Sequence, residues 1–315
     1  MYNCIETKRT QDTQTAVLWL HNSKGGIRML GAIVGDIVGS IYERRNIKTK
    51  DFPLFGSRCS FTDDTVMTCA VAEAVMNGGK REDFIKAMKK YGRLYPNVGY
   101  GGKFRAWLFS DGSAPYGSFG NGSAMRVSPC AWAAECDNVC KAELPDRCRD
   151  LARLSAEVTH NHPEGVKGAV ATADAIFLCR YYFGGCHGEN EQPVNNDPAE
   201  CKRLIREHIE REYGYDLSKT LDEIRPSYRF DVSCQGSVPQ AITAFLESTD
   251  FEDAIRNAIS IGGDSDTVAA ITGSMAEAAY GIPDRIKEKA YSYLDEPLRA
   301  VVRHWDGYIA RFGGE

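Results

Sequence analysis

Two short acidic motifs stand far apart in this chain of 315 residues: Ser60–Thr65 reads SFTDDT, and Gly262–Thr267 reads GGDSDT. Each holds two aspartates within three positions, flanked by threonine hydroxyls, and each precedes an apolar stretch with helical spacing. If the fold brings the motifs together, four carboxylates share one small volume and repel one another unless cations hold them. Oxygen ligands of this kind suit hard ions such as Mg²⁺, Mn²⁺ or Ca²⁺. The residues therefore predict a two-metal hydrolytic site assembled from both ends of the chain.

A simpler alternative exists for each motif taken singly. Asp and Thr are favoured at helix starts because they satisfy free amides and complement the helix dipole. The doubled acids at both starts, each ahead of an apolar helix rich in small residues, favour a bound metal over a pair of ordinary helix starts.

Glycine-rich segments form a second candidate layer. Gly117–Ser123 (GSFGNGS) and Gly101–Lys103 each lead into an expected helix, where exposed amides attract anions such as phosphate. Within the first segment, Phe119 offers a stacking face, and Asn121 offers both a donor and an acceptor. Together they are suited to a nucleotide, although many such loops are plain turns. The sequence contains no GxxxxGK[ST] motif and no strand-linked GxGxxG, so a P-loop or Rossmann site is not indicated.

Three further side chains are candidates. His160 and His162 stand two positions apart before Pro163, a spacing that does not place them on one helix face, so a helical zinc pair is not expected. His160 is interpreted as a polar substrate contact and His162 as structural. Glu43 follows a segment whose one other acid is Asp36, and it is either a surface residue or a mobile carboxylate near the metals.

Helical periodicity dominates the chain and predicts an all-α fold. Clear start and stop signals bound a helix over 63–76. An amphipathic helix is expected over 81–94, and a helix of small apolar residues, expected to be central, over 265–280. A helix over 29–43 carries Gly31, Gly35 and Gly39, which would permit close packing. A buried helix interrupted by Pro129 is expected over 123–135, and 227–232 is the best candidate for a short strand.

Composition restricts the classes of partner. With 43% hydrophobic and 26% charged residues, the chain has the composition of an ordinary globular protein. A net charge of −5 without a basic stripe gives no indication of nucleic acid, and no apolar run approaches the roughly 18 residues that span a membrane. The 11 cysteines lack zinc-site spacing, and the apolar patch 16–20 is too short for a signal-peptide core. We therefore expect reduced, buried thiols in a cytoplasmic protein, taken as a monomer.

The chain divides into a polar N-terminal extension, residues 1–28, and one domain, residues 29–315. The stretch 184–198 is the clearest loop or insertion.

Taken together, six ordered segments resemble the ADP-ribosylglycohydrolase family, which includes ADP-ribosylhydrolases and dinitrogenase-reductase-activating glycohydrolases. They are GAIVGDIVGSIYE (31–43), FTDDTVM (61–67), GYGGKF (99–104), GSFGNGSAMRVSP (117–129), SAEVTHNHPEGVKGA (155–169) and GGDSDTVAAITGS (262–274). They stand in the family's order and are spread over nearly the whole chain from Met29. Phe119 stands where some members have Tyr, so stacking would persist while a phenolic hydrogen bond would not.

The resemblance implies a single compact, roughly orthogonal helical bundle with two Mg²⁺ ions, for which Mn²⁺ is a substitute. It implies metal ligation by Thr62, Asp63, Asp64, Asp264, Asp266 and Thr267. Among these, Asp64 and Asp264 are candidate catalytic carboxylates beside Glu43. It also implies an ADP-ribose site lined by Gly101, Gly102, Gly117, Ser118, Phe119, Gly120, Asn121 and His160.

The activity implied by the resemblance is hydrolysis of the glycosidic bond between ADP-ribose and an acceptor, with an ADP-ribosylated protein as the expected partner. Two alternatives remain open on the sequence. One is an ADP-ribose-binding member without activity, like those recruited as lens crystallins. The other is a hydrolase of a free derivative such as O-acetyl-ADP-ribose.

Overall fold

The structure is a computed structural model that describes residues 28–133, 145–183 and 197–311. These residues form 15 helices and no strand, which confirms the expected all-α fold. In chain order the helices are α2 (Leu30–Gly39), α3 (Asp63–Met76), α4 (Arg81–Leu94), α5 (Gly102–Phe109), α6 (Gly122–Met125), α7 (Ser128–Trp132), α8 (Asp146–Glu157), α9 (Pro163–Phe183), α10 (Pro198–Tyr213), α11 (Leu221–Ile224), α12 (Cys234–Leu246), α13 (Phe251–Ser260), α14 (Ser265–Tyr280), α15 (Asp284–Tyr293) and α16 (Glu296–Ile309).

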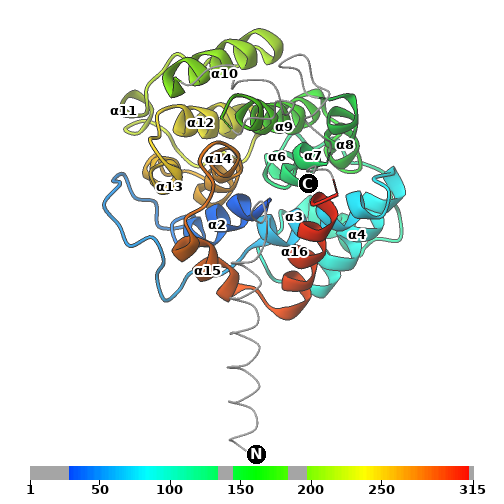
Figure 1. Cartoon of the computed structure of the whole chain (residues 1–315). Helices are drawn as coiled ribbons and strands as arrows, with labels where there is room; N and C mark the ends of the chain where they lie inside the picture. Colours follow the sequence, from blue (N-terminus) through cyan, green and yellow to red (C-terminus); the bar gives the residue numbers. More distant parts are fainter. Residues whose placement is uncertain (1–27, 134–144, 184–196, 312–315) are drawn as a thin grey trace, which may run out of the picture.

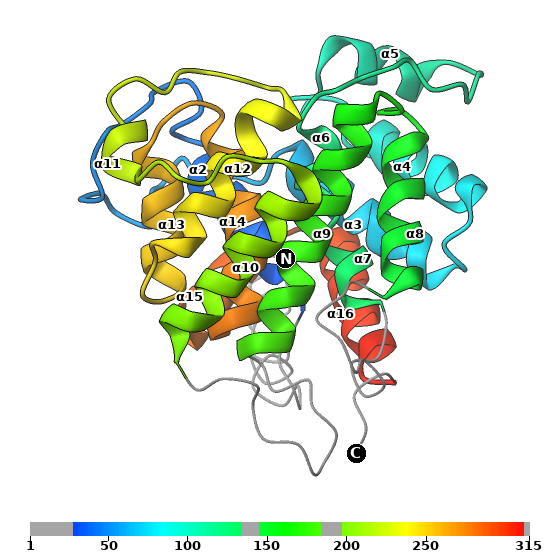
Figure 2. The same cartoon turned by 90° about the horizontal axis from the view of Figure 1, so that it is seen from above.

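The central helix of the bundle is α14, nearly all of whose residues are buried. It packs against α2, α9, α12 and α13. Figures 1 and 2 show α2 and α14 side by side near the middle, although they come from opposite ends of the chain. In Figure 1, α9, α10 and α12 lie above this pair, and α3, α4 and α16 lie to its right.

The close packing of α2 on α14 depends on a row of small residues. A Cβ atom at Gly31 or Gly35 would run into backbone atoms of Gly273 or Ala269 on α14. A Cβ atom at Gly39 would lie 2.5 Å from Asp266 Cα. The glycine spacing predicted close helix packing, and the structure shows that the partner is α14. The contact brings the C-terminal end of α2 against the start of α14.

Several element boundaries differ from the sequence-based expectation. The helix expected over 29–43 ends at Gly39, so Glu43 lies in the turn that follows. The helix expected over 123–135 is two short helices, α6 and α7, with Pro129 in the first turn of α7, where its missing amide costs nothing. The short α11 and the amphipathic α15 were not anticipated.

The prediction of a short strand over 227–232 is wrong. The following residue, Ser233, forms one isolated antiparallel bridge with Gly120. Pairing cannot extend further because the chain enters α6 at Gly122 and α12 at Cys234.

Other expectations are settled only in part. The seven cysteines among the described residues are buried, as expected, whereas the other four, Cys4, Cys136, Cys140 and Cys186, lie outside those residues. Residues 1–27 and 184–196 also lie outside them, so the proposed extension and most of the 184–198 loop stay predictions. No helix within the described ranges has the length and apolarity that crossing a membrane requires.

Candidate functional site

The first acidic motif starts α3 and is anchored by Asp36 on α2. The Thr62 amide donates to Asp36 Oδ2 (2.9 Å) and the Thr62 hydroxyl donates to Oδ1 (2.6 Å). The Thr65 amide (3.0 Å) and the Thr65 hydroxyl both donate to Oδ2. Since Asp36 is buried and each of its oxygens already accepts hydrogen bonds, we assign it the role of holding the motif in place. The hydrogen of the Thr62 hydroxyl points to Asp36, and the Asp64 amide donates to the same oxygen (3.3 Å), which leaves one lone pair of Thr62 Oγ1 for another partner.

The second acidic motif starts α14 after two glycines in the left-handed region, Gly262 (φ +71°) and Gly263 (φ +77°). Asn46 fixes this turn, because its Oδ1 accepts from the Gly263 amide (2.7 Å) and its Nδ2 donates to the Gly263 carbonyl (2.9 Å). Both motifs therefore gain their geometry from contacts with α2 and the turn that follows it.

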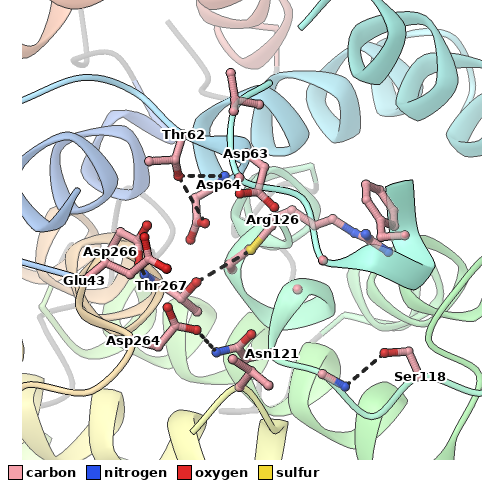
Figure 3. Close-up of a pocket in the computed structure, with 18 of the residues that line it drawn as sticks. Glu43, Thr62, Asp63, Asp64, Ser118, Asn121, Arg126, Asp264, Asp266 and Thr267 are labelled. Atoms are coloured by element: carbon pink, nitrogen blue, oxygen red, sulfur yellow. Dashed lines mark hydrogen bonds between the residues drawn. The ribbon is translucent and has the colours of Figure 1, made fainter. Parts of the chain in front are cut away.

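The two motifs meet, as the sequence predicted. Carboxylate oxygens of Asp36, Asp64 and Asp266 lie within 4.8 Å of one another, and all three residues are buried. Figure 3 shows Asp64, Asp266 and Glu43 converging on one end of a cavity, with Asp264 and Thr267 beside them and Ser118 at the other end.

Burial of these acids is electrostatically costly without a cation. Burial raises the pKa of Asp64 well above its ordinary value, and the charges of Asp36 and Asp63 raise it further. Burial, and next the charge of Asp36, raise the pKa of Asp63 to about 8. Burial and the neighbouring Asp64 and Asp264 likewise raise the pKa of Asp266.

The acids fit a divalent metal. The buried Asp64 Oδ1 has no hydrogen-bond partner, which is an unusual state for a buried carboxylate oxygen. None of the ion pairs within the described part of the chain involves Asp63, Asp64, Asp264 or Asp266. An all-oxygen set with uncompensated charge is the environment that Mg²⁺ or Mn²⁺ requires.

The cavity next to the acids has a volume of about 460 Å³. Its lining contains most of the residues proposed from the sequence: Glu43, Thr62, Asp63, Asp64, Gly101, Gly102, Ser118, Gly120, Asn121, His160, Asp264, Asp266 and Thr267. One cavity thus holds both the predicted metal ligands and most of the predicted substrate contacts.

Asn121 connects the two layers of the site. Its Nδ2 donates to Asp264 Oδ2 (2.7 Å) and to Ser237 Oγ (3.0 Å), and its amide donates to the Val232 carbonyl (2.7 Å). Burial raises the pKa of Asp264, whereas the bond from Asn121 lowers it. Asn121 therefore orients Asp264, and it also connects residues 117–123, the glycine loop, to the segment before α12.

Two predicted substrate residues, Gly117 and Phe119, are not among the residues that line this cavity. The Phe119 ring is 49% exposed and packs edge-on against His162, with ring centroids 5.4 Å apart. Their assigned roles therefore stay predictions, and His162 has a packing role at the loop surface.

The sequence reasoning missed five residues that shape the site, and signals existed for some of them. Asp36 is the one acid of an apolar helix, and Arg126 is a cation in a segment expected to be buried. Phe230 and Val232 line the cavity, each about half exposed, and their alternate spacing was interpreted as a strand. Asn46 gave no signal in the sequence.

Comparisons with known proteins agree with this geometry. The family model described as ADP-ribosylglycohydrolase matches residues 28–309. ADP-ribosylhydrolase ARH3 of Bos taurus is 27% identical over 342 residues, covering 88% of this chain and 91% of the relative. The ADP-ribosyl-[dinitrogen reductase] glycohydrolase of Rhodospirillum rubrum is 27% identical over 262 residues, covering 80% of each chain.

A solved structure, described as an ADP-ribosylglycohydrolase-related protein complex, has the same fold, with a TM-score of 0.59 and 24% identity. It covers 90% of this chain and 95% of its own. The family expected from the six motifs, and the glycohydrolase class of enzyme that goes with it, are therefore confirmed. Because the family model spans almost all of the described fold, including both acidic motifs, the chain belongs to the ADP-ribosylglycohydrolase family.

Proposed function

We propose that this protein is a magnesium-dependent hydrolase that cleaves the glycosidic bond between ADP-ribose and an acceptor, releasing ADP-ribose. The observation that carries the proposal is the buried cluster of acids with the orphaned Asp64 Oδ1, which opens onto a cavity of nucleotide-binding size. Two ordinary helix starts, or a binding pocket that holds no metal, would not explain why these buried carboxylates lack a compensating positive charge.

Six side chains are proposed to hold the ions, three from each motif: Thr62, Asp63, Asp64, Asp264, Asp266 and Thr267. The distribution of oxygens over two helix starts supports two ions rather than one. Asp36 is not assigned as a ligand, because its oxygens already accept four hydrogen bonds from Thr62 and Thr65.

The rest of the cavity is suited to a nucleotide diphosphate attached to ribose. Its volume of about 460 Å³ lies within the range of small-molecule sites, roughly 300–1,000 Å³. Gly101 and Gly102 stand at the start of α5, where free amides favour a phosphate. Phe230 and Val232 supply an apolar rim for a base.

In the proposed reaction, water attacks the anomeric carbon of the ribose, and the bond from that carbon to the acceptor breaks. Glu43 is proposed to take one proton from the water and to give it up for the leaving acceptor, so that the hydroxyl stays on the ribose and the acceptor leaves protonated. The acids beside the ribose favour the positive charge that develops on the ring in the transition state. Asn121 holds Asp264 in position through its 2.7 Å bond. When bound, magnesium supplies positive charge that aligns ribose hydroxyls and acidifies water.

The acceptor is proposed to be a protein side chain. The relative from Rhodospirillum rubrum bears the name of a glycohydrolase of ADP-ribosylated dinitrogen reductase, which is a protein substrate. The bovine relative is named an ADP-ribosylhydrolase without reference to its acceptor.

The test measures free ADP-ribose, by chromatography and mass spectrometry, released from Arg-linked, Ser-linked and acetylated ADP-ribose with Mg²⁺ or with EDTA. We expect release with Mg²⁺ from at least one substrate, suppression by EDTA, and a loss of about a hundredfold or more in Asp64→Asn. Asp83→Asn is a matched control, because Asp83 caps the start of α4 outside the cavity. Binding of ADP-ribose without release from any substrate would refute the proposal.

A further inference from the structure

A buried series of hydrogen bonds runs from Arg126 to the wall of the cavity. Arg126 Nη2 donates to the Ser155 carbonyl (2.7 Å) and to Thr159 Oγ1 (2.9 Å). Thr159 Oγ1 lies 2.7 Å from His160 Nδ1. Arg126, Thr159 and His160 are each at most 5% exposed, and Arg126 and His160 line the cavity while Thr159 lies behind them. None of these three bonds involves an acid of the metal site.

The direction of each bond follows from which atoms carry hydrogens. A guanidinium group only donates, so Thr159 Oγ1 must accept from Arg126. The hydroxyl has one hydrogen to give, and within the described ranges the remaining partner of Oγ1 is His160 Nδ1. Thr159 therefore donates to Nδ1, which must be the unprotonated nitrogen of the ring.

The ring is neutral, so its hydrogen is on Nε2. Burial, and next the positive charge of Arg126, hold the pKa of His160 well below its ordinary value. A neutral imidazole carries one hydrogen, and the nitrogen that does not accept from Thr159 has to carry it.

The Nε2 atom faces the glycine loop. A Cβ atom at Gly122 would lie 3.3 Å from Nε2, and one at Gly120 would lie 3.6 Å from it. The rings of Phe104 and Tyr116 pack near the imidazole, with centroids 6.5 and 6.1 Å away, so the ring has little freedom to turn. Among the residues that the structure describes, Nε2 has no hydrogen-bond partner, and the cavity beside the loop is where one would lie.

We infer that Arg126 and Thr159 are positioning residues that fix His160 in the Nε2–H tautomer, so that it donates a hydrogen bond to an oxygen of the ligand in the cavity. The opposite tautomer would present a lone pair at Nε2 and repel a phosphate or ether oxygen. The identity of the ligand as ADP-ribose rests on the proposed function, whereas the tautomer does not.

The tautomer is tested in the ligand-free protein labelled with ¹⁵N-histidine. His160→Gln identifies the His160 signals in long-range proton–nitrogen correlation spectra. We expect a shift typical of an unprotonated nitrogen at Nδ1 and of a protonated nitrogen at Nε2. Thr159→Ser keeps the hydroxyl and should preserve both shifts, whereas Thr159→Val removes it and should move both toward the values of a tautomer mixture. A protonated Nδ1 in the wild type, or unchanged shifts in Thr159→Val, would overturn the inference.

A calorimetric titration with ADP-ribose tests the donated bond. If Thr159→Val leaves about half of the rings in the competent tautomer, its Kd rises about twofold, whereas His160→Phe loses the donor and its Kd rises about tenfold. Thr159→Ser should bind like the wild type. An unchanged Kd in His160→Phe would overturn the donated bond. Absence of ADP-ribose binding by the wild type would instead overturn the proposed ligand, while the ligand-free spectra would still decide the tautomer.

Discussion

Asp36 offers the sharpest test of how the fold builds the site. Its carboxylate accepts from the amides of Thr62 (2.9 Å) and Thr65 (3.0 Å) and from both of their hydroxyls. In Asp36→Asn, the amide nitrogen replaces one oxygen and is itself a donor. Placed at the Oδ1 position, it would donate to the Thr62 hydroxyl, whose own hydrogen must then turn away toward the cavity, and the start of α3 loses its buried anion.

Two effects of this substitution oppose each other. Hydrogen bonds to a charged group stabilise by about 1.5–3 kcal/mol each and those to a neutral group by about 0.5–1.5 kcal/mol, so weakening the four bonds would destabilise the metal-bound protein by about 2–5 kcal/mol. In the metal-free protein, the substitution also removes one of several crowded negative charges, because Asp36 raises the pKa of Asp63 and Asp64. The loss of stability should therefore be smaller in EDTA than in Mg²⁺.

Urea unfolding with and without Mg²⁺ measures the difference. For the wild type at a Mg²⁺ concentration of about 100 Kd, the ion adds about 2.7 kcal/mol to the free energy of unfolding. If the turned Thr62 hydroxyl weakens Mg²⁺ binding about tenfold, the same Mg²⁺ concentration adds only about 1.4 kcal/mol to the free energy of unfolding of Asp36→Asn. Asp83→Asn should lose a little stability equally under both conditions. If Mg²⁺ stabilises Asp36→Asn by as much as it stabilises the wild type, the assignment of Asp36 as the anchor of the metal site is refuted.

Three further predictions concern the rim, the acids and α14. Phe230→Ala should raise KM about tenfold with kcat nearly unchanged, as expected for a lost stacking contact, and Phe119→Ala should change KM less. If steady-state kinetics show the larger change in Phe119→Ala, the stacking residue is Phe119, as the sequence predicted. Because the pKa of Asp63 without metal is about 8, protons compete with Mg²⁺ for this carboxylate. In thermal shift assays, the increase in Tm caused by Mg²⁺ should therefore grow from pH 6 to pH 9. The same increase in Tm at every pH would contradict this prediction. Burial raises the pKa of Glu277 on α14 to about 8, so between pH 4.5 and 8 the folded state keeps a proton that the unfolded state loses. The free energy of unfolding should therefore fall as the pH rises toward 8. Urea midpoints measured across this pH range should fall less in Glu277→Gln than in the wild type.

The parts of the fold that the sequence predicted well are those with strong local signals. The bounds of α3 were predicted because Thr62 is a good N-cap and an Asn-Gly-Gly stop follows at 77–79. The bounds of α14 were predicted from the doubled acids and the apolar run that follows. Where local signals are weak, as over 123–135, tertiary packing decides, and two short helices replace the one expected.

The candidate site shows the same division. The candidate metal ligands could be proposed because each motif is contiguous in the sequence and the resemblance covers both, and all six line one cavity. Asp36, Arg126 and Phe230 were missed as parts of the site because their roles depend on contacts with distant segments. Asp36 reaches residues 26 and 29 positions away, and Arg126 reaches a residue 33 positions away. Such roles have no local signature apart from a polar residue in an apolar context.

The acids and the glycine loop (117–123) depend on each other through a few close contacts. The absence of a Cβ atom at Gly39 lets α2 approach Asp266, and the same helix carries Asp36, which fixes Thr62. Asn121 then joins Asp264 to the glycine loop. Because the acids repel one another when no cation is present, the ion should tighten all of these contacts at once. We therefore expect Mg²⁺ to order the glycine loop (117–123) as well as the acids, which would couple substrate affinity to metal affinity.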